Sequence, residues 1–396
     1  MPRPESQPQT ISVRTGVDSD SQYGGVIPPI HMSSTFSFAG FGEARAHDYS
    51  RSGNPTRDRL ADALRDLEGG VAATVTATGM AAITTVLQLL GPEDRILATH
   101  DCYGGTFRLL DAWAEKGAFK LDFVDFNDPD ATRQALSQGP KLVWLETPSN
   151  PLLRITDIQR VAEQARAAGA RVVVDNTFLS PVLQRPLDLG ADIVVHSTTK
   201  YINGHSDVIG GAIISGDPEL GETIAWWANC LGVTASAMDC WLTLRGLRTL
   251  HARLRLHQEN AVNVCEFLSE HPAVKTVHYP GLASHPGHLI ARRQQNGFGA
   301  MLSFELNGGE AQVREFLSRL RCITLAESLG GVESLIAHPA TMTHAAMHPD
   351  ARQRAGIGDG LLRLSVGIES PGDLIADLDQ ALSGLAQPTA FEGGLS

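Results

Sequence analysis

Short apolar runs alternate with amphipathic helical patterns between residues 58 and 215, and this alternation restricts the folds open to the chain. Two of the runs, Val172–Val174 and Ile193–Val195, are β-branched and uninterrupted, as is typical of strands buried on both faces of a sheet. The expected strands are Ala72–Thr76, Arg95–Thr99, Phe123–Val124, Leu142–Leu145, Val172–Val174 and Ile193–Val195. Strands that alternate with helices predict an α/β fold, with a mostly parallel sheet covered by helices on both faces.

The pattern changes after about residue 215. A long helical region runs from Leu242 toward Phe267, and alternating stretches follow at Met301–Leu306 and Leu362–Val366. Ser370-Pro371 then opens a last helix. These features predict a smaller α+β domain at the C-terminal end.

A chain of 396 residues is too long for one ordinary core, so we expect more than one domain. The expected divisions are an N-terminal arm (1–60), a large domain (61–255) and a small domain (256–396). The arm is rich in Gly, Pro, Ser and Thr and would bury little of itself. We therefore expect it to pack on its own large domain or on a neighbouring subunit.

Two helix boundaries have local signals. A helical pattern starts at Asp58 and is ended by Gly69-Gly70. Thr156–Gln159 fits a capping box before an apolar stripe that Gly169 ends.

Composition argues against several classes of partner. The net charge of −12 disfavours binding to nucleic acid or to an anionic membrane surface. No apolar run approaches the ~18 residues of a membrane span, and Met1–Thr10 has no signal-peptide core. The five cysteines are odd in number and form no C-x-x-C pair, which favours free thiols over disulfides or zinc. We expect a cytoplasmic protein.

Lys200 and Asp175 follow two of the expected strands. The C-terminal ends of such strands are where open α/β sheets place their ligands. Burial lowers the pKa of a lysine and so favours the neutral amine that a Schiff base requires. Asp175 is suited to hold a cationic ring nitrogen. A reactive amine and a buried acid are groups that hold pyridoxal 5′-phosphate (PLP).

Phosphate contacts are expected from two loops. Gly79 and Met80 stand between a strand and a helix, where backbone N–H groups can face an anion. Ser197 and Thr199 add hydroxyl donors from the segment that carries Lys200. Two loops that converge on one phosphate are stronger evidence than either alone.

Each of these residues also has a simpler interpretation. Lys200 could be a solvated lysine past a strand end, and Asp175 could cap a turn. Tyr103 could stack on a cofactor ring and share protons, or it could be a turn aromatic. Arg363 could be a solvated charge on a sheet face, or it could grip an amino-acid carboxylate with help from Asn150.

Two other kinds of site are disfavoured. His338, His344 and His348 have roughly metal-like spacing, but no cysteine or paired carboxylate lies near them in the sequence. His205-Ser206-Asp207 contains the residues of a hydrolase triad, but adjacent residues cannot face one another in that geometry, and no G-x-S-x-G elbow is present. We expect no metal.

With these residues assembled, the chain resembles the PLP-dependent enzymes of cysteine and methionine metabolism, the cystathionine synthase and lyase family. The resemblance covers nearly the whole length. The segments that carry it are Tyr49–Thr56, Glu146–Pro151, Val174–Thr177, Ser197–Asp207 and Glu327–Ser334.

The resemblance implies the aspartate aminotransferase-like PLP fold (fold type I) and a homotetramer built from two active dimers. It implies that Lys200 carries the cofactor, that Asp175 faces its ring nitrogen and that Tyr103 stacks on it. It also implies phosphate contacts from Gly79, Met80, Ser197 and Thr199, and from Tyr49 and Arg51 of a neighbouring subunit. For the substrate carboxylate it implies Asn150, Ser328 and Arg363.

Within the family, three segments resemble the bacterial cystathionine γ-synthase branch: His47–Tyr49, His100–Gly105 and Ala225–Asn229. Glu327, which is also a candidate substrate-binding residue, speaks against the β-lyases, and Gly105 speaks against methionine γ-lyase. Ser52 stands where some γ-synthases have a second arginine, and the γ-lyase branch also has serine there. The choice between γ-synthase and γ-lyase therefore stays open.

The expected reaction is a γ-replacement in trans-sulfuration and methionine biosynthesis. It would form L-cystathionine and succinate from O-succinyl-L-homoserine and L-cysteine, with Arg108 and Asp48 as candidates for the distal end of the substrate. The alternatives are a cystathionine γ-lyase, an O-acylhomoserine sulfhydrylase, an aminotransferase that uses the same cofactor, and a binding protein in which the lysine is incidental.

Overall fold

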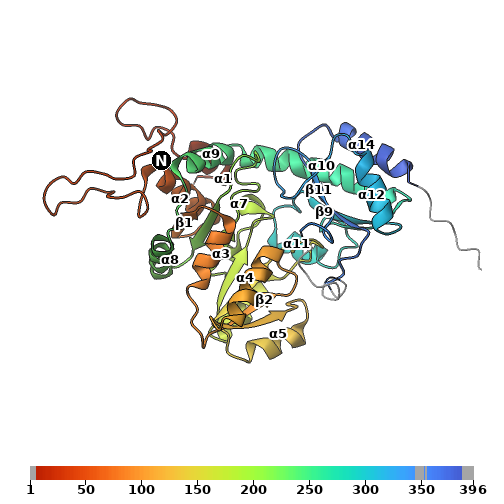
Figure 1. Ribbon diagram of the computed structural model, residues 1–396, viewed down its shortest axis with the longest axis horizontal. Coiled ribbons are helices and arrows are strands. Elements are labelled where there is room, and N and C mark those ends of the chain that lie inside the picture. The colour runs from red at the N-terminus through yellow and green to blue at the C-terminus, as the bar shows by residue number, and fades with distance from the viewer. Residues whose placement is uncertain (1–5, 344–351, 353–354, 386–396) are drawn as a thin grey trace, which may run out of the picture.

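The computed structural model describes residues 6–343, 352 and 355–385 (Figure 1). The helices before residue 232 are α1 (Pro8–Arg14), α2 (Pro55–Glu68), α3 (Gly79–Leu87), α4 (Gly104–Glu115), α5 (Pro129–Leu136), α6 (Ile158–Ala167), α7 (Ser180–Leu183), η1 (Pro186–Leu189) and α8 (Pro218–Leu231). The later helices are α9 (Ala237–Leu247), α10 (Leu250–Glu270), α11 (His288–Gln294), α12 (Glu310–Arg319) and α14 (Pro371–Ser383).

The larger sheet has seven strands in the order β1-β7-β6-β5-β4-β2-β3. Their bounds are β1 (Ala72–Thr76), β2 (Arg95–Thr99), β3 (Lys120–Val124), β4 (Leu142–Glu146), β5 (Arg171–Asp175), β6 (Ile193–His196) and β7 (Gly211–Ser215). β6, β5, β4, β2 and β3 pair in parallel, and only β7 runs against its neighbours. The predicted α/β fold with a mostly parallel sheet is confirmed.

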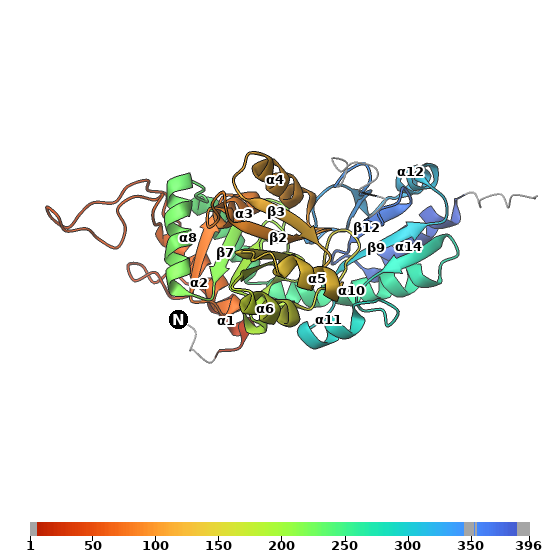
Figure 2. The ribbon, with the colours of Figure 1, turned by 90° about the horizontal axis from the view of Figure 1, so that it is seen from below.

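Helices cover both faces of this sheet (Figure 2). Apolar side chains of α3, α4 and α8 pack on one face, and those of α5 and α6 pack on the other. α2 packs against β1 and β7 at the end of the sheet opposite β3. The helices leave the C-terminal ends of the parallel strands free for loops.

The second sheet has five strands in the order β10-β11-β12-β9-β8 and is antiparallel except for β10 with β11. Its strands are β8 (Val274–His278), β9 (Met301–Leu306), β10 (Thr324–Leu325), β11 (Leu335–Ala337) and β12 (Leu361–Ser365). α10 packs against β8, β9 and α14, and it spans the length between the two sheets (Figure 1). This is the α+β region expected at the C-terminal end.

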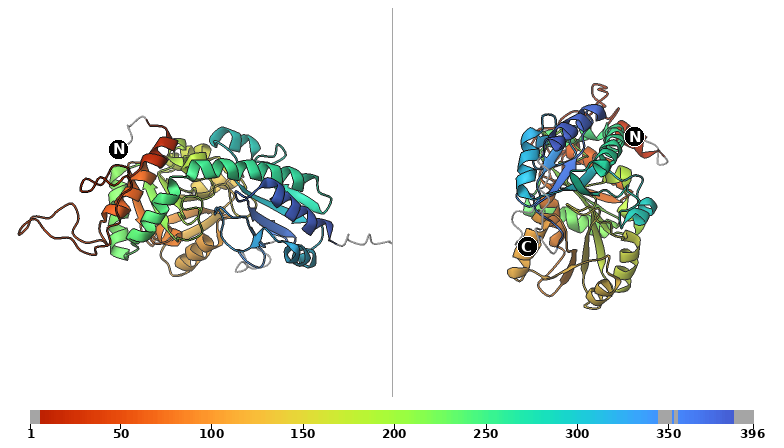
Figure 3. Two further views of the ribbon diagram at one scale, coloured as in Figure 1. Left: turned by 90° about the horizontal axis from the view of Figure 1, so that it is seen from above. Right: turned by 90° about the vertical axis from the view of Figure 1, so that its right-hand side faces the viewer.

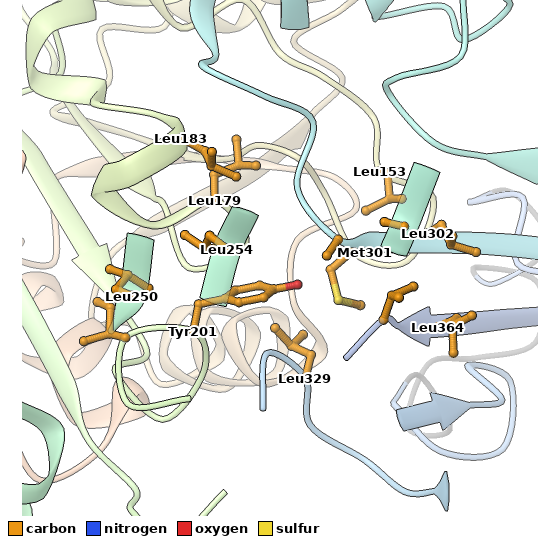
Figure 4. Packing of buried hydrophobic residues seen from close by; sticks show 14 of the residues in the cluster. Leu153, Leu179, Leu183, Tyr201, Leu250, Leu254, Met301, Leu302, Leu329 and Leu364 are labelled. Atoms are coloured by element: carbon orange, nitrogen blue, oxygen red, sulfur yellow. The ribbon is translucent and has the colours of Figure 1, made fainter. Parts of the chain in front are cut away.

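One apolar core connects the two regions. Its buried residues come from α2, α9 and α10 and from the second sheet. Figure 4 shows Tyr201 within this core, between Leu254 and Leu329 and near Met301. The residue that follows Lys200 is therefore a core residue, which fixes the backbone at the lysine.

Several local expectations need correction. β7 was not predicted, and the long helical region is two helices, α9 and α10. α2 begins at Pro55, because Asn54 accepts hydrogen bonds from two first-turn N–H groups. The capping box at Thr156 is wrong, since the cap is Asp157, which accepts from the Arg160 N–H. The divisions after residues 60 and 255 both fall inside helices and stay predictions.

The segment between α1 and α2 projects away from the two sheets (Figures 1 and 3). Several of its large apolar side chains are exposed, and Tyr23 and Phe41 are almost entirely so. Among the described residues, no helix is both long and apolar enough to cross a bilayer.

The loop after Lys200 packs against α9 and α10. The Arg253 guanidinium is buried and donates to the carbonyl oxygens of Tyr201 (2.8 Å) and Gly246 (2.9 Å). Gly246 lets α9 approach this loop, because a Cβ there would lie 2.1 Å from the Asn203 carbonyl oxygen. Any side chain at residue 246 would displace the backbone beside the lysine.

We predict that Gly246→Ala lowers the free energy of unfolding by about 1–3 kcal/mol, because the added methyl group meets backbone that cannot move freely. Gly309→Ala is the matched control, since nothing lies within 4 Å of a Cβ at that position. Urea denaturation followed by circular dichroism measures both. Equal losses for the two variants would contradict the close packing of α9 on the loop.

Candidate active site

A cavity of about 830 Å³ lies at the C-terminal edge of the larger sheet. It brings together twelve of the residues predicted from the sequence. They are Gly79, Met80, Tyr103, Arg108, Asn150, Asp175, Ser197, Thr199, Lys200, Glu327, Ser328 and Arg363. They come from the ends of five strands of the larger sheet, from the loops and helices that follow these strands, and from the C-terminal region.

Lys200 lies in the loop after β6, and its Nζ donates to the Ser328 hydroxyl (2.7 Å). Burial is the main reason that its pKa falls to about 8, and the positive charge of Arg363 lowers it further. A substantial fraction of this amine is therefore neutral near pH 8. A solvated lysine past a strand end would not have this environment.

Asp175 ends β5, and its Oδ1 accepts a hydrogen bond from the Thr177 N–H (3.0 Å). It therefore does cap the turn, and it also lines the cavity. Burial raises the pKa of this carboxyl, while hydrogen bonds from Thr177 oppose the rise. A cation placed against Asp175 would stabilise the ionised form.

The opposite side of the cavity is formed by the start of α3 and the loop after β6. Thr78 caps α3 by accepting from the Ala81 N–H, and Gly79 and Met80 form the first turn. A Cβ at Gly79 would lie only 2.9 Å from the Ser197 Cβ, so glycine lets the two loops meet. First-turn N–H groups have no partner within a helix and suit an anion.

Arg363 reaches the cavity from β12 and is only 3% exposed. Its guanidinium donates to the Asn150 Oδ1 (3.0 Å) and to the Ser328 carbonyl oxygen (3.0 Å). Burial lowers its pKa to about 10, so the group stays charged at neutral pH. A buried guanidinium is a suitable partner for a carboxylate.

Tyr103 precedes α4, and its ring is partly exposed in the cavity. A Cβ at Gly105 would lie 2.4 Å from the Tyr103 Cε1 and 3.0 Å from the Met80 Sδ. Glycine at residue 105 therefore leaves the space that the tyrosine ring occupies beside Met80.

Three predicted residues do not line the cavity of their own chain: Asp48, Tyr49 and Arg51. Arg51 Nη1 donates instead to the Asn229 side chain (2.6 Å), and the Ser52 hydroxyl donates to Asp48 (2.9 Å). Their roles toward a cofactor or substrate stay predictions.

The disfavoured sites have other partners. His338 has one ring nitrogen near the Thr341 hydroxyl (2.9 Å) and the other near the Asp359 carbonyl oxygen (3.0 Å). His344 and His348 lie outside the described residues. Ser206 donates to Glu333, not to His205.

Sequence reasoning did not assign a role to Glu146. This residue ends β4, lines the cavity and accepts a hydrogen bond from the Tyr103 N–H (2.7 Å). The rule that located Asp175, an acid directly after an apolar run, applies equally to Glu146 after Leu142–Leu145.

A model of the Cys/Met metabolism PLP-dependent enzyme family matches residues 9–383. The chain belongs to this family. Cystathionine gamma-synthase of Escherichia coli is 58% identical over 371 residues, covering 93% of this chain and 96% of that protein. A solved structure of cystathionine gamma synthase from Xanthomonas oryzae pv. oryzae in complex with cystathionine is 61% identical, with a TM-score of 0.95, covering 96% and 98%. Cystathionine gamma-lyase of Dictyostelium discoideum is 47% identical over 374 residues, covering 94% and 97%.

The resemblance inferred from the sequence is thus confirmed, and PLP is the cofactor of this enzyme family. The cavity fits that group. It offers a buried amine of lowered pKa, a carboxyl on the neighbouring strand and a helix N-terminus packed closely against Ser197. Lys200 would hold the aldehyde end of PLP, and Asp175 would hold its ring nitrogen. The phosphate would lie where Gly79 meets Ser197.

We predict that the rate of PLP incorporation into cofactor-free enzyme rises with pH around a midpoint near 8, because only neutral Lys200 attacks the aldehyde. The negative charge of Glu327 raises the Lys200 pKa, so Glu327→Gln should move the midpoint to lower pH. Glu163→Gln, an exposed change on α6, should leave it in place. Stopped-flow absorbance measures the rates. A midpoint near 10, as for an ordinary lysine, would show that the amine is not desolvated.

Proposed function

We propose that this PLP enzyme forms L-cystathionine and succinate from O-succinyl-L-homoserine and L-cysteine. The observation that carries the proposal is the identity of 58% and 61% to two cystathionine gamma-synthases over nearly the full chain. The lyases named in the comparisons are 42–47% identical.

The residues around the cavity support this reaction. Arg363, with Asn150 and Ser328, is arranged to grip the carboxylate of an amino acid. Lys200 Nζ, as the neutral amine, is the base available to take and return protons at the substrate's Cα and Cβ, with Tyr103 beside it. Bound PLP supplies the electron withdrawal that makes the Cα proton removable.

The far end of the substrate needs partners for a second carboxylate and for the incoming cysteine. Arg108 on α4 is an exposed cation at the cavity and is our candidate for the succinyl carboxylate. Glu327 is the candidate for the cysteine amino group. Asp48 would act from a neighbouring subunit.

A second candidate reaction is cleavage of cystathionine by a γ-lyase activity. Ser52 favours it, because the resemblance places a second arginine at this position in some γ-synthases. Here the Ser52 hydroxyl only holds Asp48 and the Tyr49 carbonyl oxygen. O-Acylhomoserine sulfhydrylase activity, with sulfide in place of cysteine, is the third outcome of the same assay.

Purified cofactor-loaded enzyme should make cystathionine and succinate from O-succinylhomoserine and cysteine. It should release little 2-oxobutyrate and ammonia from cystathionine alone. Mass spectrometry of the products under both conditions decides the matter, and Lys200→Ala is the inactive control. Faster cleavage than synthesis would establish the lyase instead, and homocysteine formation from sulfide at a higher rate would establish the sulfhydrylase.

We also infer that the chain assembles as a homotetramer of two active dimers, with Tyr49 and Arg51 reaching the phosphate site of a neighbouring subunit. The support is that these residues lie outside their own cavity, on a segment that projects from the body with large apolar side chains exposed (Figure 3). We infer a cytoplasmic location as well, since all five cysteines are free.

Subunit complementation should test this assembly. Lys200→Ala and Arg51→Ala each remove a different part of the site, so mixed dimers regain one intact site, and coexpression should restore activity. Lys200→Ala coexpressed with the Lys200→Ala/Arg51→Ala double variant should stay inactive, because no subunit then has the lysine. Failure of the first mixture, with mixed dimers verified by mass spectrometry, would show that each chain completes its own site.

A further inference from the structure

Glu146 and Asp175 are two acids at the ends of neighbouring parallel strands. They stand opposite each other in the register of β4 and β5, where adjacent strands lie about 4.8 Å apart. Both line the cavity, and Glu146 is only 5% exposed. Two carboxylates in such a place cannot both ionise easily, so the pair should keep one proton.

The surroundings decide which acid keeps the proton. Burial is the largest cause that raises the pKa of Glu146, and the charges of Asp175 and Asp101 raise it further. The N–H groups of Tyr103 and Asn150 oppose this rise but do not cancel it. Arg363, from β12, is a cation close enough to Glu146 for the two charges to interact.

Asp175 has better support for its negative charge. Thr177 hydrogen-bonds to it through both its side chain and its backbone, and the field of His196 lowers its pKa as well. A protonated ring nitrogen against Asp175 would favour its ionised form further. The proton of the pair therefore belongs on Glu146.

Glu146 also determines where Tyr103 lies. The Tyr103 N–H donates to the Glu146 Oε2 (2.7 Å), and Tyr103 immediately precedes α4. The absence of a side chain at Gly105 leaves room for the ring beside Met80. The hydrogen bond to Glu146 thus fixes the backbone from which the ring extends into the cavity.

We propose that Glu146 is a positioning residue that holds Tyr103 as a neutral carboxylic acid and leaves Asp175 as the single carboxylate for the ring nitrogen of PLP. The proposal concerns the cofactor site and holds whichever reaction the enzyme catalyses. A second carboxylate beside Asp175 would change the protonation of the cofactor, whereas a neutral acid gives the Tyr103 N–H its acceptor without adding charge.

The first test uses Glu146→Gln, which keeps an oxygen acceptor and is always neutral. Infrared difference spectra of the holoenzyme, wild type minus variant at neutral pH, should show loss of a protonated-carboxyl band. Glu163→Gln, an exposed control, should show loss of carboxylate bands only. If Glu146→Gln also removes only carboxylate bands, Glu146 is ionised and the proposal is wrong.

The second test follows the visible band of the lysine-bound cofactor against pH. Glu146→Gln should titrate within a few tenths of a pH unit of wild type, since no charge is lost. A shift of about one unit or more would overturn the proposal, because it would mean that an ionised group had been removed.

The third test separates positioning from charge. Glu146→Ala leaves the Tyr103 N–H without its acceptor and should weaken PLP binding about tenfold, whereas Glu146→Gln should stay within about twofold. Titration of cofactor-free enzyme with PLP gives both constants. Equal affinity in the alanine variant would remove the positioning role. If the alanine variant does not fold, Glu146→Gln alone tests the proposal. Loss of PLP affinity by more than about tenfold in Glu146→Gln would contradict the positioning role, because this variant keeps a neutral acceptor for the Tyr103 N–H.

Discussion

Strands β1, β2, β4, β5 and β6 all end at one edge of the larger sheet, because β7 alone runs the opposite way. This shared direction brings the polar groups that the larger sheet supplies to the cofactor site to one edge of the sheet. Parallel strands are buried on both faces, so their polar side chains are placed at the C-terminal ends, where ligands bind. Reversing any one of them would move its terminal acid or lysine to the far edge of the sheet.

A collection of charges at this edge is costly unless each group has a partner. The C-terminal region supplies several of these partners. Ser328 accepts the hydrogen bond of Lys200, and Arg363 donates to both Asn150 and Ser328. On the other side, Arg253 of α10 holds the carbonyl oxygen of Tyr201. The site thus depends on contacts between the two sheets as well as on strand direction.

Much of the fold followed from local patterns, and the failures have specific causes. β1, β2 and β9 were predicted with their observed bounds from local patterns: short runs of strand-forming residues in β1 and β2, and alternation of apolar and polar residues in β9. β7 was missed, since Gly210 before it and Gly211 at its start suggest a loop, and only pairing with β1 and β6 makes it a strand. The cap of α6 was misplaced by one residue, because Thr156 and Asp157 are both good caps and the choice depends on tertiary contacts.

The site was predictable in part for the same reason. Lys200 and Asp175 could be placed together because strand direction brings their positions to one edge. The pairing of Lys200 with Ser328 could not be inferred, because the two residues are 128 positions apart and meet only when the second sheet packs on the first. Glu146, like Asp175, is an acid directly after an apolar run and could have been predicted by the same rule. Its hydrogen bond to the Tyr103 N–H could not be predicted, because it depends on the path of the loop after β2.

The attachment of Tyr103 has a consequence for how the cavity receives a ligand. Its backbone N–H donates to Glu146, while the residue as a whole remains 42% exposed. The backbone and the ring are therefore placed by different contacts: the backbone by a buried acceptor, and the ring by the space that Gly105 leaves beside Met80. A ligand in the cavity can contact the tyrosine ring while the backbone of Tyr103 keeps its hydrogen bond to the sheet edge.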